Sequence, residues 1–217
     1  MVQHDSQENL IRRVLSELQE RLLVNKKRKL VHRKESPVYR PAFHVKINFP
    51  FRPSIAYRFG NCAFDEDSLR FILLHEEKHI RSPFSWMMPT ALITVDVYVL
   101  VQLLVQLAAA QAFLMAFFIL GAIWYGSMPL LRYGEVRADL WSAQKLKSDF
   151  GIRAPSKVAF KALDWPDALE SRTRKAIRQV ILGAIHPSKA KRVARIAEEV
   201  DDYPGDQDEG QVGLPLM

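Results

Sequence analysis

The segment DEDSLRFILLHEEKHIR, residues 65–81, carries the strongest secondary-structure signal in the chain. Its first four residues, from Asp65 to Ser68, offer N-cap oxygens and negative charge, which stabilise the start of a helix. An apolar run follows, and Pro83 stands just beyond the segment, where a helix usually ends. The pattern therefore predicts a helix over residues 69–80.

The same helix carries the motif His75-Glu76-Glu77-Lys78-His79, an H-E-x-x-H sequence. Two residues four positions apart on a helix are separated by about 40° around its axis, so both imidazoles can reach one metal ion. The carboxylate of Glu76 can approach the open coordination position and take a proton from a water molecule there. His75 and His79 are therefore predicted to bind one zinc ion per chain, with Glu76 as the general base.

Residues 84–131 form the most apolar part of the chain and contain one formal charge, Asp96. As a helix this block would extend roughly 70 Å, about twice the ~30 Å hydrocarbon core of a bilayer. Two antiparallel spans that turn near residues 108–111 fit this length, whereas a buried soluble hairpin would need a larger partner surface than the rest of the chain offers. Basic residues flank both ends of the block. This bias predicts an integral membrane protein whose catalytic domain and termini are cytoplasmic.

An even number of spans returns the chain to the side from which it left, so residues after the block can meet residues before it. Glu135 and Asp139 follow the block, four positions apart on a helix predicted over residues 132–147. Glu135 can supply a third zinc ligand, and Asp139 can orient a ligating imidazole from behind. The alternative interpretation of this acidic pair is a solvated helix face.

These motifs together resemble the M48 peptidase family, which includes the bacterial heat-shock membrane peptidases and the CAAX-prenyl endopeptidases. The likeness spans residues 54–195 and includes His186-Pro187-Ser188 followed by Arg192. It implies a gluzincin arrangement, with the glutamate ligand on a second helix, and hydrolysis of membrane or membrane-near polypeptides. It also implies that His186 and Arg192 act at the catalytic site by steadying the oxyanion. Their alternative interpretation is a helix N-terminus followed by a basic surface.

The expected fold is α+β: a mainly helical, gluzincin-like catalytic domain with a small β-hairpin or edge strand, interrupted by a two-helix transmembrane hairpin. Alternating apolar residues predict short strands within residues 43–64, with a tight turn at Gly60-Asn61. The family likeness implies an edge strand that holds an extended substrate by backbone pairing. Residues 55–59, with Ile55, Ala56 and Tyr57 as the substrate contacts, or residues 62–64 would form it.

The rest of the chain divides by composition into segments of different character. An amphipathic helix is predicted over residues 9–24, and the basic residues after it suit either a solvated face or contact with a membrane surface. Further helices are predicted over residues 157–163, 166–182 and 187–200. The expected organisation is an N-terminal helix and basic segment (1–42), a zinc peptidase domain (43–83 and 132–197), a transmembrane hairpin (84–131) and an acidic disordered tail (198–217).

The formal charge of +7 and the single cysteine, Cys62, narrow the classes of function further. One cysteine excludes an intramolecular disulfide and a cysteine-based zinc site. The basic residues gather in residues 26–34, on both flanks of the apolar block and in residues 172–195, a pattern that suits contact with anionic lipid at least as well as contact with nucleic-acid phosphates. The sequence contains no recognised nucleic-acid motif, so no nucleic-acid partner is expected. The expected partners are a polypeptide substrate and the lipid bilayer, and the hairpin offers a surface for homo-oligomerisation.

A second function stays open, that of a catalytically weak or inactive membrane adaptor or signalling sensor. Glu77 and Lys78 stand where the family usually has small residues, and Gly134 stands where it often has asparagine. None of these departures removes a predicted ligand. The intact Glu76 favours a hydrolase, because a pure binding protein has no need of a general base.

Overall fold

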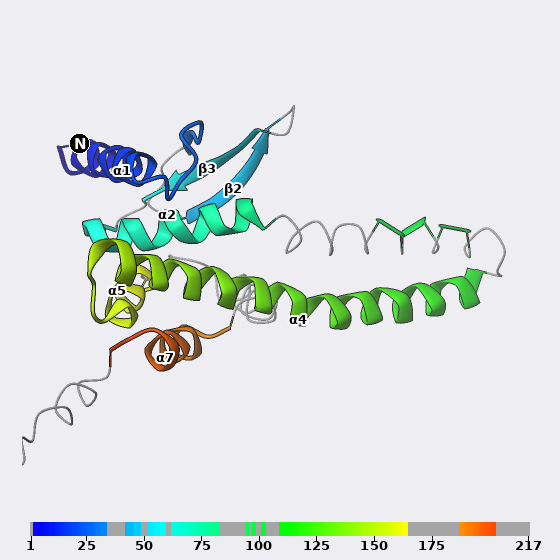
Figure 1. The fold of residues 1–217 in the computed structure, drawn as a ribbon. Helices are drawn as coiled ribbons and strands as arrows, with labels where there is room; N and C mark the ends of the chain where they lie inside the picture. The colour runs from blue at the N-terminus through cyan, green and yellow to red at the C-terminus, as the bar shows by residue number, and fades with distance from the viewer. Residues whose placement is uncertain are drawn as a thin grey trace, which may run out of the picture.

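The computed structural model describes residues 2–33, 42–48, 52–59, 62–82, 94–95, 97–98, 101–102, 109–164 and 187–202. These residues form a mainly helical structure, as expected (Figure 1). The small β part is a mixed sheet of three strands, where the sequence predicts a hairpin or an edge strand. The elements are α1 (Val2–Glu20), β1 (Leu30–His32), β2 (Ala42–Asn48), β3 (Arg52–Arg58), α2 (Glu66–Arg81), α4 (Ala109–Phe150), α5 (Pro155–Ala162) and α7 (Lys189–Glu199).

Helix α2 lies at the centre of the structure, between the sheet on one side and α4 on the other (Figure 1). It begins where the sequence predicts a cap: Ser68 N donates to the side chain of Asp65 over 2.8 Å. The apolar run that follows is buried, including Leu69, Phe71 and Leu73. The predicted helix is therefore confirmed, with its first turn starting earlier, at Glu66.

The sheet has the order β1-β3-β2, with β1 parallel and β2 antiparallel to β3. Ile55 on β3 pairs with Leu30 on one side and Val45 on the other. Ile55, Ala56 and Tyr57 therefore lie on the central strand, and their predicted position at the sheet edge is wrong. Their backbone is already paired on both sides, so it has no open edge for a substrate.

The strands also differ from the prediction in where they begin and end. The antiparallel strands β2 and β3 are connected by residues that lie outside the described part of the chain. The predicted turn at Gly60-Asn61 also lies outside the described part. Residues 62–64 form no strand, so the second predicted edge strand is wrong. Strand β1 was not predicted, because its three residues follow a basic run and are too short to show alternation.

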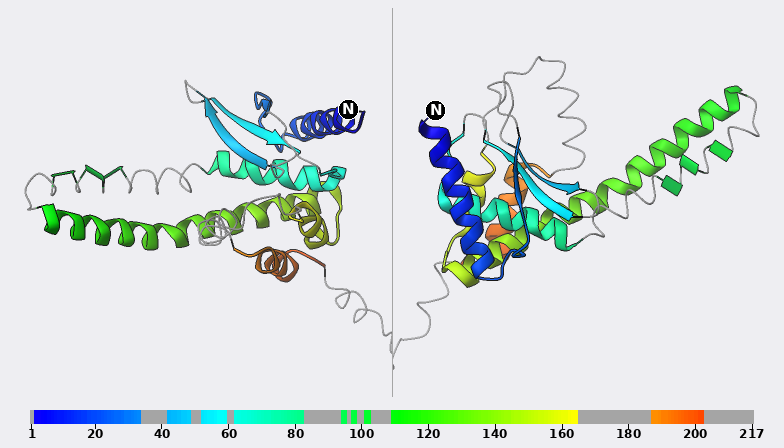
Figure 2. Two further views of the ribbon diagram at one scale, coloured as in Figure 1. Left: turned by 180° about the vertical axis from the view of Figure 1, so that it is seen from behind. Right: turned by 90° about the horizontal axis from the view of Figure 1, so that it is seen from above.

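Helix α1 packs against α2 (Figure 2). Its side chains form part of the hydrophobic core. Ile11, Val14 and Leu18 on its inner face are fully buried. Gln7 fixes the start of this contact, because its side chain donates to Phe64 O over 3.3 Å and accepts from Phe64 N over 3.0 Å. The amphipathic pattern that predicts a helix here marks a core-facing stripe.

Helix α4 runs without a break for 42 residues, with Pro129 inside it. The sequence places Pro129 near the end of one helix and starts another at residue 132, so this boundary is wrong. A single proline removes one helical hydrogen bond, and the many bonds on both sides of it keep a helix of this length continuous. Asp96 and most of residues 83–108 lie outside the described residues. Among the helices of the described residues, none combines the length and the apolar composition of a membrane span.

The C-terminal segment packs against α4 and α5 beyond the predicted end of the domain. Lys147 Nζ donates to Val200 O over 2.7 Å, and Ser156 N donates to Asp201 over 3.0 Å. The prediction of a disordered tail from residue 198 is therefore wrong up to residue 202, because residues 198–202 are held by these contacts. Residues 203–217, and the helix predicted over residues 166–182, lie outside the described part.

Candidate metal centre

Helices α2 and α4 run side by side in opposite directions (Figure 1) and bring His75, His79 and Glu135 together. Glu135 Oε2 lies 3.5 Å from His75 Nε2, and Glu135 Oε1 lies 3.2 Å from His79 Nε2. The two imidazole nitrogens lie 3.0 Å apart. One ligand atom from each residue falls within 4.8 Å of the other two, so the three donors converge on one small volume. Two neutral imidazoles and one carboxylate suit zinc, and three ligands leave a coordination position open.

Asp139 holds His75 from the side opposite this volume. Its Oδ1 lies 2.9 Å from His75 Nδ1, which leaves Nε2 directed toward Glu135. Asp139 is in turn held by Arg192, whose Nε and Nη2 donate to the two carboxylate oxygens over 2.6 Å each. Such a chain of contacts fixes the orientation of a ligating imidazole and raises its basicity.

Glu76 follows His75 on α2 and is buried, with 8% of its surface exposed. Burial raises the pKa of its carboxyl group, against the lowering effect of His75 and His79. A raised pKa makes a carboxylate a stronger base than a solvated one, which favours the uptake of a proton from water. The residue type, position and environment of Glu76 therefore suit acid–base chemistry beside the three converging donors.

The geometry of the centre agrees with a comparison of the whole chain. The family model for Peptidase family M48 matches residues 13–200. The chain belongs to peptidase family M48. No curated protein and no solved structure gives a match. Members of family M48 are zinc metallopeptidases, so membership makes this chain a metallopeptidase and implies a metal ion and polypeptide substrates.

The structure of this M48 peptidase gathers most of the residues predicted for its site. His75, His79 and Glu135 converge, Glu76 lies beside them, and Asp139 contacts an imidazole. Arg192 lies at the centre too, but two of its nitrogens bond Asp139, and its Nη2 reaches only to 4.0 Å from Glu135 Oε2. His186 lies outside the described residues. The catalytic roles of all these residues stay predictions.

A buried ion pair between Arg28 and Glu77 lies beside the site, and no sequence pattern predicts it. Glu77 is 1% exposed and accepts from Arg28 Nε over 2.8 Å and from Arg81 Nε over 3.1 Å. Arg28 also donates to Pro53 O over 2.6 Å, so this network ties the catalytic helix to the sheet. Arg28 stands in a basic run that reads as a solvated face. The sequence gives one indication of the ion pair between Arg28 and Glu77: Glu77 stands where the family pattern usually has a small residue.

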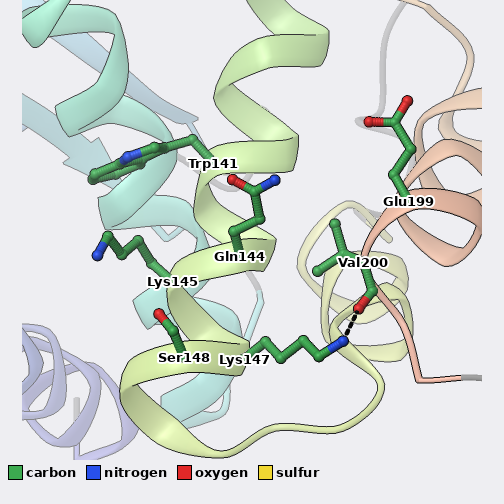
Figure 3. A pocket seen from close by; sticks show the side chains of 7 residues that line it. All are labelled: Trp141, Gln144, Lys145, Lys147, Ser148, Glu199 and Val200. Carbon is green, nitrogen blue, oxygen red and sulfur yellow. Dashed lines mark hydrogen bonds between the residues drawn. The ribbon is translucent and has the colours of Figure 1, made fainter.

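A shallow hollow of about 510 Å³ lies farther along α4 and is distinct from the metal centre (Figure 3). Its lysines already have partners: Lys145 lies 3.4 Å from Asp149, and Lys147 bonds Val200 O. The hollow therefore offers no converging free donors of the kind found at the metal centre. Its lining residues are Trp141, Gln144, Lys145, Lys147, Ser148, Glu199 and Val200.

The Asp139→Asn variant is expected to bind zinc about 10- to 100-fold more weakly than the wild type, because an amide holds the His75 imidazole and Arg192 less firmly than a carboxylate does. Competition with a chromogenic chelator measures this affinity. Asp149→Asn, on the same helix but away from the three donors, is the control. Equal affinity in the two variants would remove Asp139 from the support of the site.

The metal-free protein is expected to lose stability as the pH rises above neutrality. Burial lowers the pKa of His75, but Asp139 and Glu135 outweigh it and raise the pKa from 6.5 to about 10. Because the folded-state value is the higher one, the protonated imidazole stabilises the metal-free fold fully below pH 6.5, and this stabilisation is lost as the pH rises toward about 10. Urea unfolding of chelator-treated protein measures the decline. A decline of equal size in His75→Gln would show that another group causes it.

Proposed function

We propose that this M48 peptidase is a membrane-bound zinc endopeptidase that hydrolyses membrane or membrane-near polypeptides. The observation that carries the proposal is the convergence of His75, His79 and Glu135 from two antiparallel helices. We propose that these three residues bind one zinc ion per chain. Glu76, buried beside them with a raised pKa, is positioned to act as the general base.

When bound, the zinc ion polarises the scissile carbonyl and acidifies a water molecule. Glu76 takes the proton of the attacking water on its carboxylate and later returns it to the leaving amine. Asp139 keeps the His75 imidazole in the orientation that presents Nε2 to the centre. Burial raises the pKa of Asp139, but His75 and then Arg192 outweigh it and lower the pKa, so the carboxylate stays ionised while it holds the imidazole.

We propose that the substrate binds in an extended conformation along β2. This strand lies at one side of the sheet order β1-β3-β2 and packs against α2, the helix that carries the two histidines. Among the described strands, β3 is the one that pairs with β2, which places β2 at an edge of the sheet order. An added strand gains backbone hydrogen bonds with little dependence on its sequence, which suits an endopeptidase.

We propose that residues 84–131 form a transmembrane hairpin and that the catalytic domain and both termini are cytoplasmic. The apolar composition of this block and the basic residues at its two ends support the proposal. The described part of the block exposes large apolar side chains: Phe118, Tyr125 and Leu130 on α4 are 71%, 83% and 43% exposed. The first half of α4 also projects beyond α2, away from the sheet (Figure 1).

Cleavage by the full chain in proteoliposomes tests this function. A membrane-tethered reporter polypeptide is expected to be cut, chelation is expected to stop cleavage, and zinc is expected to restore it. Alkaline carbonate washing of the same vesicles is expected to leave the chain in the membrane fraction. Zinc binding without any cleavage would favour the adaptor or sensor instead, and release by carbonate would contradict the membrane hairpin.

A further inference from the structure

Three cations and two aromatic rings form a contiguous group on the outer face of α2 and α4. We call it the basic–aromatic cluster; its residues are Lys78, Arg81, Tyr133, Arg137 and Trp141. Lys78 Nζ and the Arg81 guanidinium lie 5.9 Å and 5.6 Å from the centroid of the Trp141 ring. The Arg137 guanidinium lies 5.5 Å from the centroid of the Tyr133 ring. Tyr133, Arg137 and Trp141 follow one another at intervals of four residues, so they share one face of α4.

The cluster concentrates positive charge. Lys78 and Arg81 both lie over the ring of Trp141, and Arg137 stands one helical turn before Trp141 on α4, so the three cations share a small area. Arg81 shares the carboxylate of Glu77 with Arg28, which leaves one negative charge between two arginines. An anion that enters the cluster would relieve the repulsion between these cations, and the planar guanidinium groups suit phosphate oxygens.

The position of the cluster indicates which anion it meets. Tyr133 is 59% exposed and lies three residues beyond Leu130, about 4.5 Å along the helix axis at the α-helical rise. Exposed apolar side chains precede it on the same helix, at Phe118 and Tyr125. Tyrosine and tryptophan beside lysine and arginine are the residues that gather at the boundary between hydrocarbon and headgroups.

We propose that the basic–aromatic cluster binds the headgroups of anionic phospholipids. The proposal rests on the membrane location given under Proposed function and goes beyond it by assigning a lipid class to named residues. Lys78, Arg81 and Arg137 neutralise lipid phosphates, while Tyr133 and Trp141 lie at the level of the headgroups. Because Lys78 shares α2 with both histidines, this contact sets the metal centre directly above the membrane surface, where membrane-near segments of substrates run.

The test uses the full chain in nanodiscs of phosphatidylcholine, with Trp86, Trp124 and Trp165 replaced by phenylalanine so that Trp141 alone fluoresces. Titration with dihexanoyl phosphatidylglycerol is expected to change the Trp141 emission and to saturate. Two lysine or arginine charges near a lipid surface together correspond to a factor of about 30, so the Lys78→Gln/Arg137→Gln variant is expected to need about 30-fold more lipid for half-saturation.

The control variant is Lys157→Gln/Lys191→Gln, which removes two charges from exposed positions on α5 and α7 and is expected to titrate like the wild type. Dihexanoyl phosphatidylcholine and inorganic phosphate are expected to leave the emission unchanged. An equal response to phosphatidylcholine, a response to phosphate alone, or an unchanged titration of the cluster variant would each overturn the proposal. Preferential binding of a soluble acidic peptide over the anionic lipid would also overturn it.

Zinc content and cleavage of a short soluble peptide are measured on the same samples. Both are expected to be equal in the wild type and the cluster variant, because the side chains of Lys78 and Arg137 lie over the rings of Trp141 and Tyr133 and supply none of the three converging donors. A lipid response without zinc-dependent cleavage would defeat the peptidase function alone. Cleavage without a selective lipid response would defeat the lipid site alone.

Discussion

Replacing Glu76 by glutamine is expected to lower kcat by about 10²- to 10⁴-fold, the range that general acid–base catalysis contributes. Glutamine has nearly the same shape as glutamate but cannot accept the proton of the attacking water. Glu76 is not one of the three converging donors, so zinc content is expected to stay at the wild-type level. Peptide cleavage measured beside zinc analysis separates these two effects.

Glu66→Gln serves as the matched control, because Glu66 lies on the same helix at its far end and its carboxylate meets Arg13 and Arg70 on the surface. This control is expected to cleave at the wild-type rate. Full activity in the Glu76→Gln variant would contradict the general-base role. A loss of zinc with the loss of activity would instead assign Glu76 to the binding of the metal.

The Glu77→Ala variant is expected to lose about 3–5 kcal/mol of unfolding free energy, because the substitution leaves the largely buried Arg28 without its carboxylate partner. The side chains of Arg28 and Glu77 are 8% and 1% exposed, so water cannot replace the lost contact. Arg81 loses the same partner at 3.1 Å. Chemical denaturation followed by circular dichroism measures the change.

Glu20→Ala provides the comparison, since Glu20 is an exposed glutamate near the end of α1. Surface substitutions of this kind usually change stability by less than about 0.5 kcal/mol. If both variants unfold at the same denaturant concentration, the network of Arg28, Glu77 and Arg81 does not hold the catalytic helix to the sheet.

Part of the metal centre could be predicted from features that are local in sequence. The spacing of His75 and His79 places both on one helix face whatever the rest of the fold does. To predict that Glu135 lies beside the two histidines, one further inference was needed, namely that the apolar block reverses the direction of the chain. The structure shows that α4 lies antiparallel to α2, which brings Glu135 and Asp139 beside the two histidines.

Features that depend on distant pairing could not be predicted in the same way. Whether Ile55 lies at an edge or in the centre depends on its pairing with β1, a distant strand of three residues that is too short to show alternation of its own. The bonds of Arg192 to Asp139 join positions 53 apart in sequence, and no local pattern distinguishes this arginine from a surface one. Pro129 is a case of a local rule overridden, because the surrounding helix is long enough to continue through it.

The zinc content of Glu135→Ala, measured beside the wild type, tests most directly whether helices α2 and α4 jointly bind one metal ion. Glu198→Ala, which alters an exposed glutamate on α7, is the control. The wild type and the control are expected to hold one zinc per chain after gel filtration, whereas Glu135→Ala is expected to lose most of it because only two imidazoles remain. Full zinc content in Glu135→Ala would contradict the proposed centre.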